Sequence, residues 1–402
     1  MKRVAISFSV IISCEILIAV IISVMTTIHL YNIVSLLFSI SFVLLFIYLM
    51  QIYNRFPVLP LFLSVICLLN VIINAFLNNG NLSFEYLKKL IMFITFVLML
   101  TQSCTEGPDV SERAFKILKF FPILGAIELI SSFFFLGNTS TLAHAITLGF
   151  SNPNFAGMWL LHFILYAVLL FMNYKEHKLL VLMAPVIILL GWLLYLTGAR
   201  SCFLALAVFF LMLILKKLNI VVPPWACTII AVFPFVFAFI YVRIIENPWV
   251  NNTFGFLVSV GKGLNSRVGI WNNAIDVFLN HPLFGDYYGI SHGTGQSQLH
   301  NTHLDVMCSY GLVPIILYVV IIKKTLQRIL AQAVSFNQYG AFSAFCTVLI
   351  VGCFEAAMVS GAMGMNLLTI GYVVLAYENL KQKDGKIYHD NRRYGSLSSN
   401  VE

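Results

Sequence analysis

The chain has 402 residues, of which 60% are hydrophobic and only 10% are charged. Soluble domains carry about 25% charged residues, so this composition excludes an ordinary water-soluble protein. Repeated apolar runs of near twenty residues instead predict an all-α polytopic membrane protein, because helices satisfy their own backbone polar groups in lipid. The formal charge of +8 would suit a nucleic-acid partner, but the placement of the basic residues argues against one.

We expect about twelve transmembrane helices in a single transmembrane domain over residues 1–380. Their expected ranges are 4–25, 33–51, 57–77, 86–103, 115–136, 153–172, 179–196, 201–215, 221–243, 303–322, 339–358 and 365–379. One large loop at 244–302, containing short helices, interrupts the apolar pattern. The polar tail at 381–402 is expected to be a disordered cytoplasmic segment.

The lysines and arginines predict the orientation of these helices. With the N-terminus inside, the inner segments hold eighteen of the 24 basic residues and the outer segments hold six. Basic residues favour the cytoplasmic side of a membrane. We therefore expect cytoplasmic termini, an external loop at 244–302 and no nucleic-acid partner.

The first candidate for chemistry in this loop is Arg267. After it, apolar residues recur with the spacing of one buried helix face, at Trp271, Ala274, Ile275, Phe278 and Leu279. Arg267 lies one turn before Trp271 and shares that face. An arginine aimed into an apolar surface is costly unless an anion meets it, so Arg267 is a candidate for bidentate phosphate binding.

Three helices are expected to begin on the outer side with residues that suit an anion site. The sixth begins with Asn152 as its N-cap and Pro153 at its first position. The eighth begins near Gly198, with Thr197 or Ser201 as its cap. The small Gly198 would let a ligand approach the backbone closely.

The tenth helix is expected to begin with His300-Asn301-Thr302, with Asp305 three residues after Thr302 in an arrangement like a capping box. Free N–H groups at helix starts favour anions. If the three starts converge, Arg200 and Arg267 beside them would complete an external anion site. Arg200 could equally reach to the lipid headgroups.

Among the external histidines, His300 stands at a helix start beside a glycine-rich run. A histidine there can be held neutral, as a general base requires. His292 is a rival, whereas His281 precedes a proline and is expected to shape the turn.

Three acids, Glu15, Glu128 and Glu355, lie within or near the expected spans. Each is open to a functional role or to hydrogen-bonded packing. Trp271 is likewise open to stacking on a sugar face or to interfacial anchoring.

Several common motifs are missing from the sequence. It has no Asp-x-Asp pair for a metal-held nucleotide sugar, no P-loop and no Gly-x-Gly-x-x-Gly. We therefore expect no metal and no cofactor. An external transferase would need a donor activated before it reaches the outer face, and a lipid-linked diphosphate sugar meets that need.

Five motifs occur in the order typical of one family. They are Asn152-Pro153-Asn154-Phe155-Ala156, Thr197-Gly198-Ala199-Arg200-Ser201, Ser266-Arg267 to Trp271, Pro282-Leu283-Phe284-Gly285, and His300-Asn301 up to Gly311. Over about residues 150–315 the chain resembles the O-antigen ligase and O-antigen polymerase superfamily. The resemblance implies a multi-pass enzyme of the bacterial cytoplasmic (inner) membrane whose external loop covers a site for undecaprenyl-diphosphate-linked glycans.

By this resemblance, Arg200 and Arg267 would hold the diphosphate and His300 would act on the acceptor. The remaining substrate-binding candidates are Asn152, Asn154, Ser201, Ser266, Trp271, His292 and Asn301. The implied reaction is polymerisation of repeat units into a surface polysaccharide, with chain-length regulator and flippase proteins of the same pathway as partners. Ligation of the glycan to lipid A core or a wall acceptor is the first alternative, and a transporter of lipid-linked oligosaccharide is the second.

Overall fold

The computed structural model describes residues 58–77, 84–105, 145–148, 153–173, 177–220, 222–247, 249, 262–287, 299–355 and 365–376. These residues form helices and no strand, which confirms the expected all-helical class for this part of the chain. The helices are α3 (Val58–Leu77), α4 (Phe84–Thr105), α7 (Pro153–Asn173), α8 (His177–Thr197), α9 (Arg200–Lys217), α10 (Ala226–Glu246), α13 (Lys262–Asn280), α15 (Thr302–Tyr310), α16 (Leu312–Gln332), α17 (Phe336–Val351) and α18 (Met365–Ala376).

Two of the described helical segments, Val58–Leu77 and Ala226–Ile244, are long and apolar enough to cross a membrane. Four shorter apolar segments lie at Lys89–Thr101, Pro153–Leu169, Ala184–Thr197 and Phe336–Val351. The expected spans at 4–25, 33–51 and 115–136 and the tail at 381–402 lie outside the described residues. The number of membrane crossings therefore stays a prediction.

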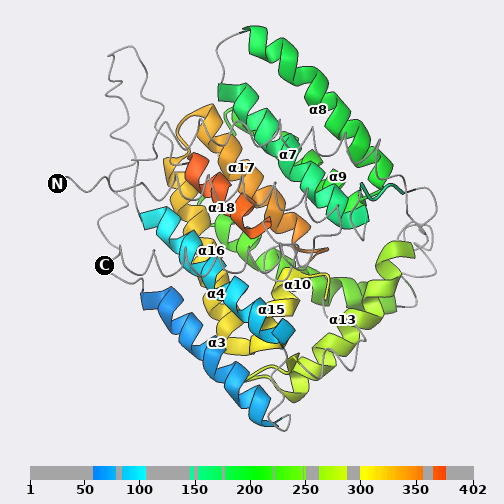
Figure 1. The fold of residues 1–402 in the computed structure, drawn as a ribbon, viewed down its shortest axis with the longest axis vertical. Coiled ribbons are helices and arrows are strands. Elements are labelled where there is room, and N and C mark those ends of the chain that lie inside the picture. The colour runs from blue at the N-terminus through cyan, green and yellow to red at the C-terminus, as the bar shows by residue number, and fades with distance from the viewer. Residues whose placement is uncertain are drawn as a thin grey trace, which may run out of the picture.

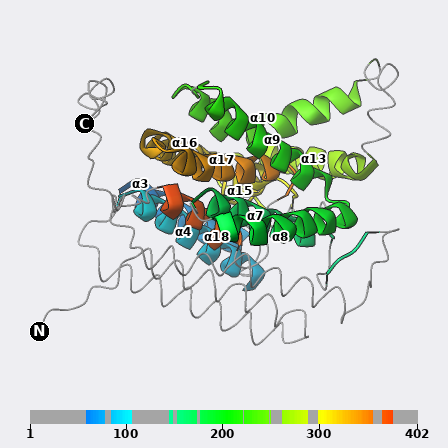
Figure 2. The ribbon, with the colours of Figure 1, turned by 90° about the horizontal axis from the view of Figure 1, so that it is seen from above.

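The helices pack in layers (Figures 1 and 2). One layer holds α3, α4, α18, α7 and α8 in that order, with α16 and α17 behind it and α9 and α10 beyond them. Hydrogen bonds join α7 to α18. The Tyr166 hydroxyl donates to the Leu368 carbonyl at 2.7 Å, and His162 Nδ1 lies 2.8 Å from the Tyr372 hydroxyl. These polar contacts fix the register of two otherwise apolar helices.

The helix expected at 303–322 is interrupted at Gly311, which separates α15 from α16. Gly311 has a φ of 91°, and a Cβ built there would meet the Leu283 carbonyl oxygen at 2.2 Å. The next residue, Leu312, donates its N–H to the Pro282 carbonyl at 2.9 Å. The Pro-Leu-Phe-Gly turn after α13 thus docks against the break, which requires glycine at 311.

Side chains from α3 and α4 bind the carbonyls at the C-terminal end of α15. The Asn70 amide donates to the Tyr310 carbonyl, and the Tyr86 hydroxyl donates to the Ser309 carbonyl at 2.8 Å. Carbonyls at a helix end lack intrahelical donors, so these contacts satisfy groups that would otherwise be buried and unpaired. They hold in place α15, all of whose residues are buried.

Asp305 of α15 forms a buried ion pair instead of the capping-box contact expected from the sequence. Its Oδ1 atom lies 3.7 Å from Lys89 Nζ on α4. The same ammonium group lies 5.1 Å from the ring centre of Tyr287, which stacks on Tyr86. The end of the described loop segment is therefore attached to the same helices that hold α15.

Candidate functional site

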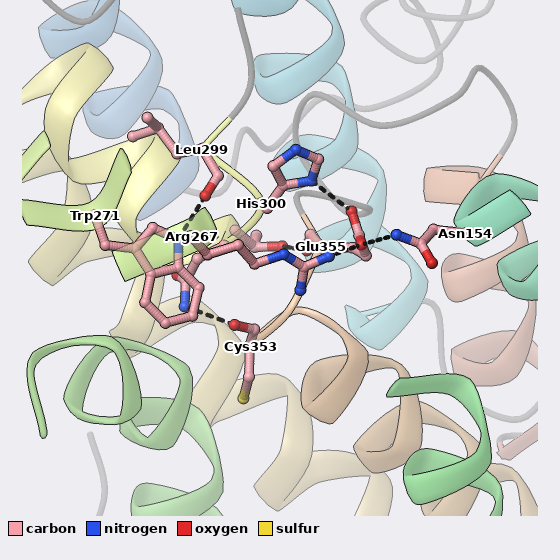
Figure 3. A network of polar contacts seen from close by, with 9 residues as sticks. Asn154, Arg267, Trp271, Leu299, His300, Cys353 and Glu355 are labelled. Carbon is pink, nitrogen blue, oxygen red and sulfur yellow. Dashed lines mark hydrogen bonds and ion pairs between the residues drawn. The ribbon is translucent and has the colours of Figure 1, made fainter. Parts of the chain in front are cut away.

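The carboxylate of Glu355 is the centre of a polar cluster shown in Figure 3. Its Oε1 atom accepts from Arg267 Nη2 at 2.5 Å and from Asn154 Nδ2 at 3.0 Å, and its Oε2 atom lies 2.8 Å from His300 Nδ1. Only 4% of the Glu355 side chain is exposed. Buried carboxylates need such partners, because desolvation of an unpaired charge is costly.

Glu355 is positioned by the turn that follows α17. Its N–H donates to the Val351 carbonyl, and its own carbonyl accepts from the Thr302 hydroxyl at 3.1 Å. The backbone N–H of Thr302 donates to the Gly352 carbonyl at 2.9 Å. The start of α15 and the end of α17 are thereby joined, which brings His300 beside Glu355.

Asn301 is the residue that caps α15, so the expected cap at Thr302 is wrong. Its side-chain oxygen accepts from the backbone N–H groups of His303 and Leu304, each at 3.0 Å. Its amide nitrogen donates to the carbonyls of Pro234 and Cys353. Because Asn301 is fully buried and both ends of its amide are occupied, its geometry is that of a structural link rather than of the expected substrate contact.

The link to α10 is made by two backbone carbonyls, one of them that of Pro234 inside the helix. A carbonyl oxygen has two lone pairs, so one that lies within a helix can accept from a second donor. The Pro234 carbonyl accepts from Asn301, and the Ala231 carbonyl lies 2.9 Å from His303 Nε2. The start of α15 is therefore attached to α10 as well as to α17.

The helix α13 delivers Arg267 to the cluster through the apolar face predicted from the sequence. Trp271, Ala274 and Phe278 are buried, and Ile275 is half-buried. Leu279 is exposed, contrary to expectation, because it lies about 80° around the helix from Trp271 at the edge of that face. This packing aims Arg267 inward, where its side chain is 12% exposed.

Trp271 has no exposed surface, so in this structure it packs in the core and does not present its ring for the expected stacking on a sugar. Its indole Nε1 donates to the Leu299 carbonyl at 2.7 Å, and its ring makes edge-to-face contacts with Phe237 and Tyr241 of α10. Trp271 therefore fixes the residue that precedes His300. Figure 3 shows its indole directed at Leu299.

His300 has a backbone φ of 52°, in the left-handed region that few residues other than glycine adopt. In the neutral tautomer in which Nδ1 donates to Glu355, Nε2 keeps its lone pair. The side chain is 21% exposed, and Nε2 makes no hydrogen bond to any described residue. A histidine oriented by a carboxylate in this way can take a proton from a hydroxyl group.

Arg200 is the first residue of α9 and is exposed. The cap of α9 is Ala199 with no side-chain hydrogen bond, so the expected caps Thr197 and Ser201 are wrong. Thr197 instead donates its hydroxyl to the Leu194 carbonyl at 2.7 Å. Ser201 is half-buried in the first turn of α9.

The start of α9 packs against the start of α7, which contributes Asn154 to the cluster. Gly157, one turn after Asn154, lies so close that a Cβ built on it would meet Ala199 Cβ at 2.3 Å. Two of the three helix starts named from the sequence are thus adjacent. The third, that of α15, meets α7 through the shared contacts of Thr302 and Asn154 with Glu355.

Other residues named from the sequence have more limited placements. Asn152, His292, Glu15 and Glu128 lie outside the described residues, and of Ser266 only its position in α13 is described. His281 is exposed in the turn after α13, with Nε2 at 3.8 Å from Asp286 Oδ2, which suits its expected part in that turn. Within the described residues, no group of three or more His, Cys, Asp or Glu could hold a metal ion.

Part of the chain matches a known protein family. Residues 185–319 match the family model described as O-antigen ligase, and a search of curated proteins finds no match. The match confirms the resemblance to the O-antigen ligase and polymerase superfamily over these residues and supports a ligase- or polymerase-type function. The matched range includes Arg200, Arg267 and His300 and ends before Glu355.

Proposed function

We propose, from the family match over residues 185–319 and the contact of Glu355 with both Arg267 and His300, that this protein is an extracytoplasmic glycosyltransferase. Its donor is a glycan on undecaprenyl diphosphate, and its acceptor is a sugar hydroxyl on another lipid-linked repeat unit. The product is a longer chain of an O-antigen, capsule or exopolysaccharide. The single observation that carries the proposal is a histidine and an arginine brought together on one buried carboxylate.

The proposed reaction is a displacement at the anomeric carbon of the donor sugar. The acceptor oxygen forms a bond to that carbon, and the bond from the carbon to the diphosphate oxygen breaks. The electron pair of the broken bond leaves with the diphosphate. The acceptor proton passes to His300 Nε2 and is later released to water.

Glu355 is the positioning residue in this scheme. Its carboxylate holds His300 in the tautomer that has a free Nε2 atom, and it stabilises the imidazolium that forms when the proton arrives. A general base such as His300 typically raises the rate of the chemical step about 10²–10⁴-fold. Asn154 supports the carboxylate from the opposite side by its 3.0 Å hydrogen bond.

Arg267 and Arg200 are proposed to bind the diphosphate, whose charge grows as it leaves. Arg267 Nη2 contacts Glu355 in this structure, and a guanidinium presents several N–H donors in one plane to an anion. Positively charged donors fixed where negative charge develops stabilise a transition state. The arginines supply this charge, so the reaction is proposed to need no metal or cofactor.

We place the protein in the bacterial cytoplasmic membrane as a multi-pass protein with cytoplasmic termini and an extracytoplasmic site. The distribution of basic residues supports this orientation. A flippase that supplies the lipid-linked unit and a chain-length regulator are the partners that such a reaction calls for.

The matched family is described as O-antigen ligase, and this observation favours ligation as the second candidate function. A ligase would use the same leaving group and the same base but would transfer a finished glycan to lipid A core or a wall acceptor. Transport of lipid-linked oligosaccharide is less well supported, because transporters usually place their polar groups near the middle of the membrane between internal repeats.

The glycan profile of a strain that lacks this protein separates the two transfer reactions. For a polymerase, we expect single repeat units to accumulate on the lipid carrier while long chains disappear. Full-length chains retained on the carrier would instead identify a ligase. An unchanged profile would contradict both.

A further inference from the structure

Arg267 is already neutralised by Glu355 in this structure. Its Nη2 atom lies 2.5 Å from Glu355 Oε1, and both side chains are largely buried, at 12% and 4% exposure. Any anion that binds Arg267 through this nitrogen must take it from the carboxylate. Glu355 is therefore a competitor held permanently beside the arginine, at the high effective concentration of an intramolecular group.

The Glu355 carboxylate keeps two other polar contacts when Arg267 moves away. Asn154 Nδ2 still donates to Oε1 at 3.0 Å, and His300 Nδ1 still lies 2.8 Å from Oε2. Removing one partner of a buried ion pair is usually costly because a bare charge remains. Here two hydrogen bonds remain, so Arg267 can leave Glu355 without stranding it.

The competition separates anions by charge. A phospholipid phosphodiester has one negative charge, like the carboxylate, and gains little by replacing it. A diphosphate that links a sugar to a lipid has two negative charges and more acceptor oxygens, which match the planar donors of an arginine. Specificity often depends on such an element that acts against the wrong ligand.

We propose that Glu355 is a specificity-determining residue, which keeps monoanionic phospholipid headgroups from Arg267 and yields it to the diphosphate of the donor. This inference rests on the proposed function. In a membrane, phospholipid headgroups greatly outnumber the donor, so an uncovered arginine would be occupied by them. Glu355 thus reserves the site for a polyprenyl diphosphate.

The test measures binding of undecaprenyl diphosphate to the purified full-length protein in bilayer nanodiscs. The lipid is either phosphatidylcholine alone or a mixture with increasing phosphatidylglycerol. For the wild type, we expect the Kd to change less than about twofold across this series. For Glu355→Gln, we expect tighter binding without phosphatidylglycerol and a loss of about tenfold as it is added, the size of one charge-assisted contact.

Glu355→Asp is the matched control, since it keeps the charge and should keep the resistance to phosphatidylglycerol. A Glu355→Gln protein that binds the diphosphate more weakly in phosphatidylcholine would show that Glu355 merely supports Arg267, and would overturn the inference. If Glu355→Gln does not fold, the wild type alone still tests the inference. Strong competition by phosphatidylglycerol for the wild-type site would overturn the proposed role of Glu355.

The Arg267→Ala variant distinguishes failure of the proposed role of Glu355 from failure of the proposed function. It should lose binding of undecaprenyl diphosphate in both lipids. If the wild type and Arg267→Ala bind the probe equally weakly, the diphosphate site itself is wrong. If Arg267 is required but Glu355→Gln retains full lipid discrimination, only the role of Glu355 is wrong.

Discussion

His300 Nδ1 lies 2.8 Å from Glu355 Oε2, although 55 residues separate them in the chain. The contact exists because Thr302 binds the backbone at both Gly352 and Glu355. It determines which nitrogen of His300 carries the proton and which faces away from the carboxylate.

Replacing His300 with asparagine should remove the base while preserving the backbone. Asparagine tolerates the left-handed region better than most residues, which matters at a φ of 52°. We expect kcat to fall about 10²–10⁴-fold, with binding of undecaprenyl diphosphate nearly unchanged. Single-turnover transfer and equilibrium binding are measured on the same preparation. A parallel loss of binding would mean that His300 holds the donor instead of the acceptor proton.

Arg267→Lys keeps the charge but replaces a planar fork by a point charge. A lysine cannot offer a diphosphate two parallel N–H groups. We expect transfer to fall about 10²–10³-fold, the typical effect of losing one transition-state donor. The measurement is chain extension in membranes with matched protein abundance.

Arg200→Lys is the informative companion of that variant. If Arg200 also binds the diphosphate, its loss of activity should be similar. If the exposed side chain only reaches the headgroups, lysine should replace it with little effect. Normal long chains from a well-expressed Arg267→Lys protein would mean that Arg267 is structural.

Gly311→Ala should disrupt the junction of α15 and α16. The added Cβ would lie 2.2 Å from the Leu283 carbonyl oxygen, and the φ of 91° is unfavourable for alanine. We expect the free energy of unfolding to fall by more than about 2 kcal/mol, which would appear as a lower thermal midpoint in detergent. Gly191→Ala is the control. Gly191 lies inside a helix, α8, and a Cβ added there would meet no atom within 4 Å. Equal effects of the two substitutions would contradict the docking of the turn at Gly311.

Helices with strong periodic patterns were predictable from the sequence. The face of α13 centred on Trp271 could be read from spacing, because one buried stripe has a fixed period. The break at Gly311 could not, since it depends on a turn some thirty residues earlier that docks there by backbone contacts. The cap at Asn301 was missed because Thr302 and Asp305 offered an equally plausible local pattern.

The candidate site was predictable only in part. Arg267 stood out as a charge on an apolar face, and the need for an anionic partner followed from desolvation. The structure supplies that partner as Glu355, which the sequence left open between function and packing. Only the fold brings Glu355 to His300 and Arg267, because no local spacing links residues so far apart. The sequence signal for Glu355 was that an acidic residue lies near an expected membrane span, where acids are candidates for function.

The orientation of the chain is tested by labelling in intact cells. We expect tags near Asn138 and Gly293 to be reachable from outside, and tags near Lys217 and at the C-terminus to be protected. The reason is the eighteen-to-six division of basic residues between the two sides. A cytoplasmic tag at Gly293 would place the site on the wrong side for a lipid-linked donor.

Transfer by purified protein in vesicles tests the proposed reaction itself. The substrate is the undecaprenyl-diphosphate-linked repeat unit isolated from the strain that lacks the protein, and a chelator is present throughout. We predict that the wild type extends the glycan and releases undecaprenyl diphosphate, whereas His300→Asn and Arg267→Lys do so at least about a hundredfold more slowly. Unextended repeat units with the wild type, or activity that returns only with magnesium, would contradict a metal-independent transferase built on Arg267, Glu355 and His300.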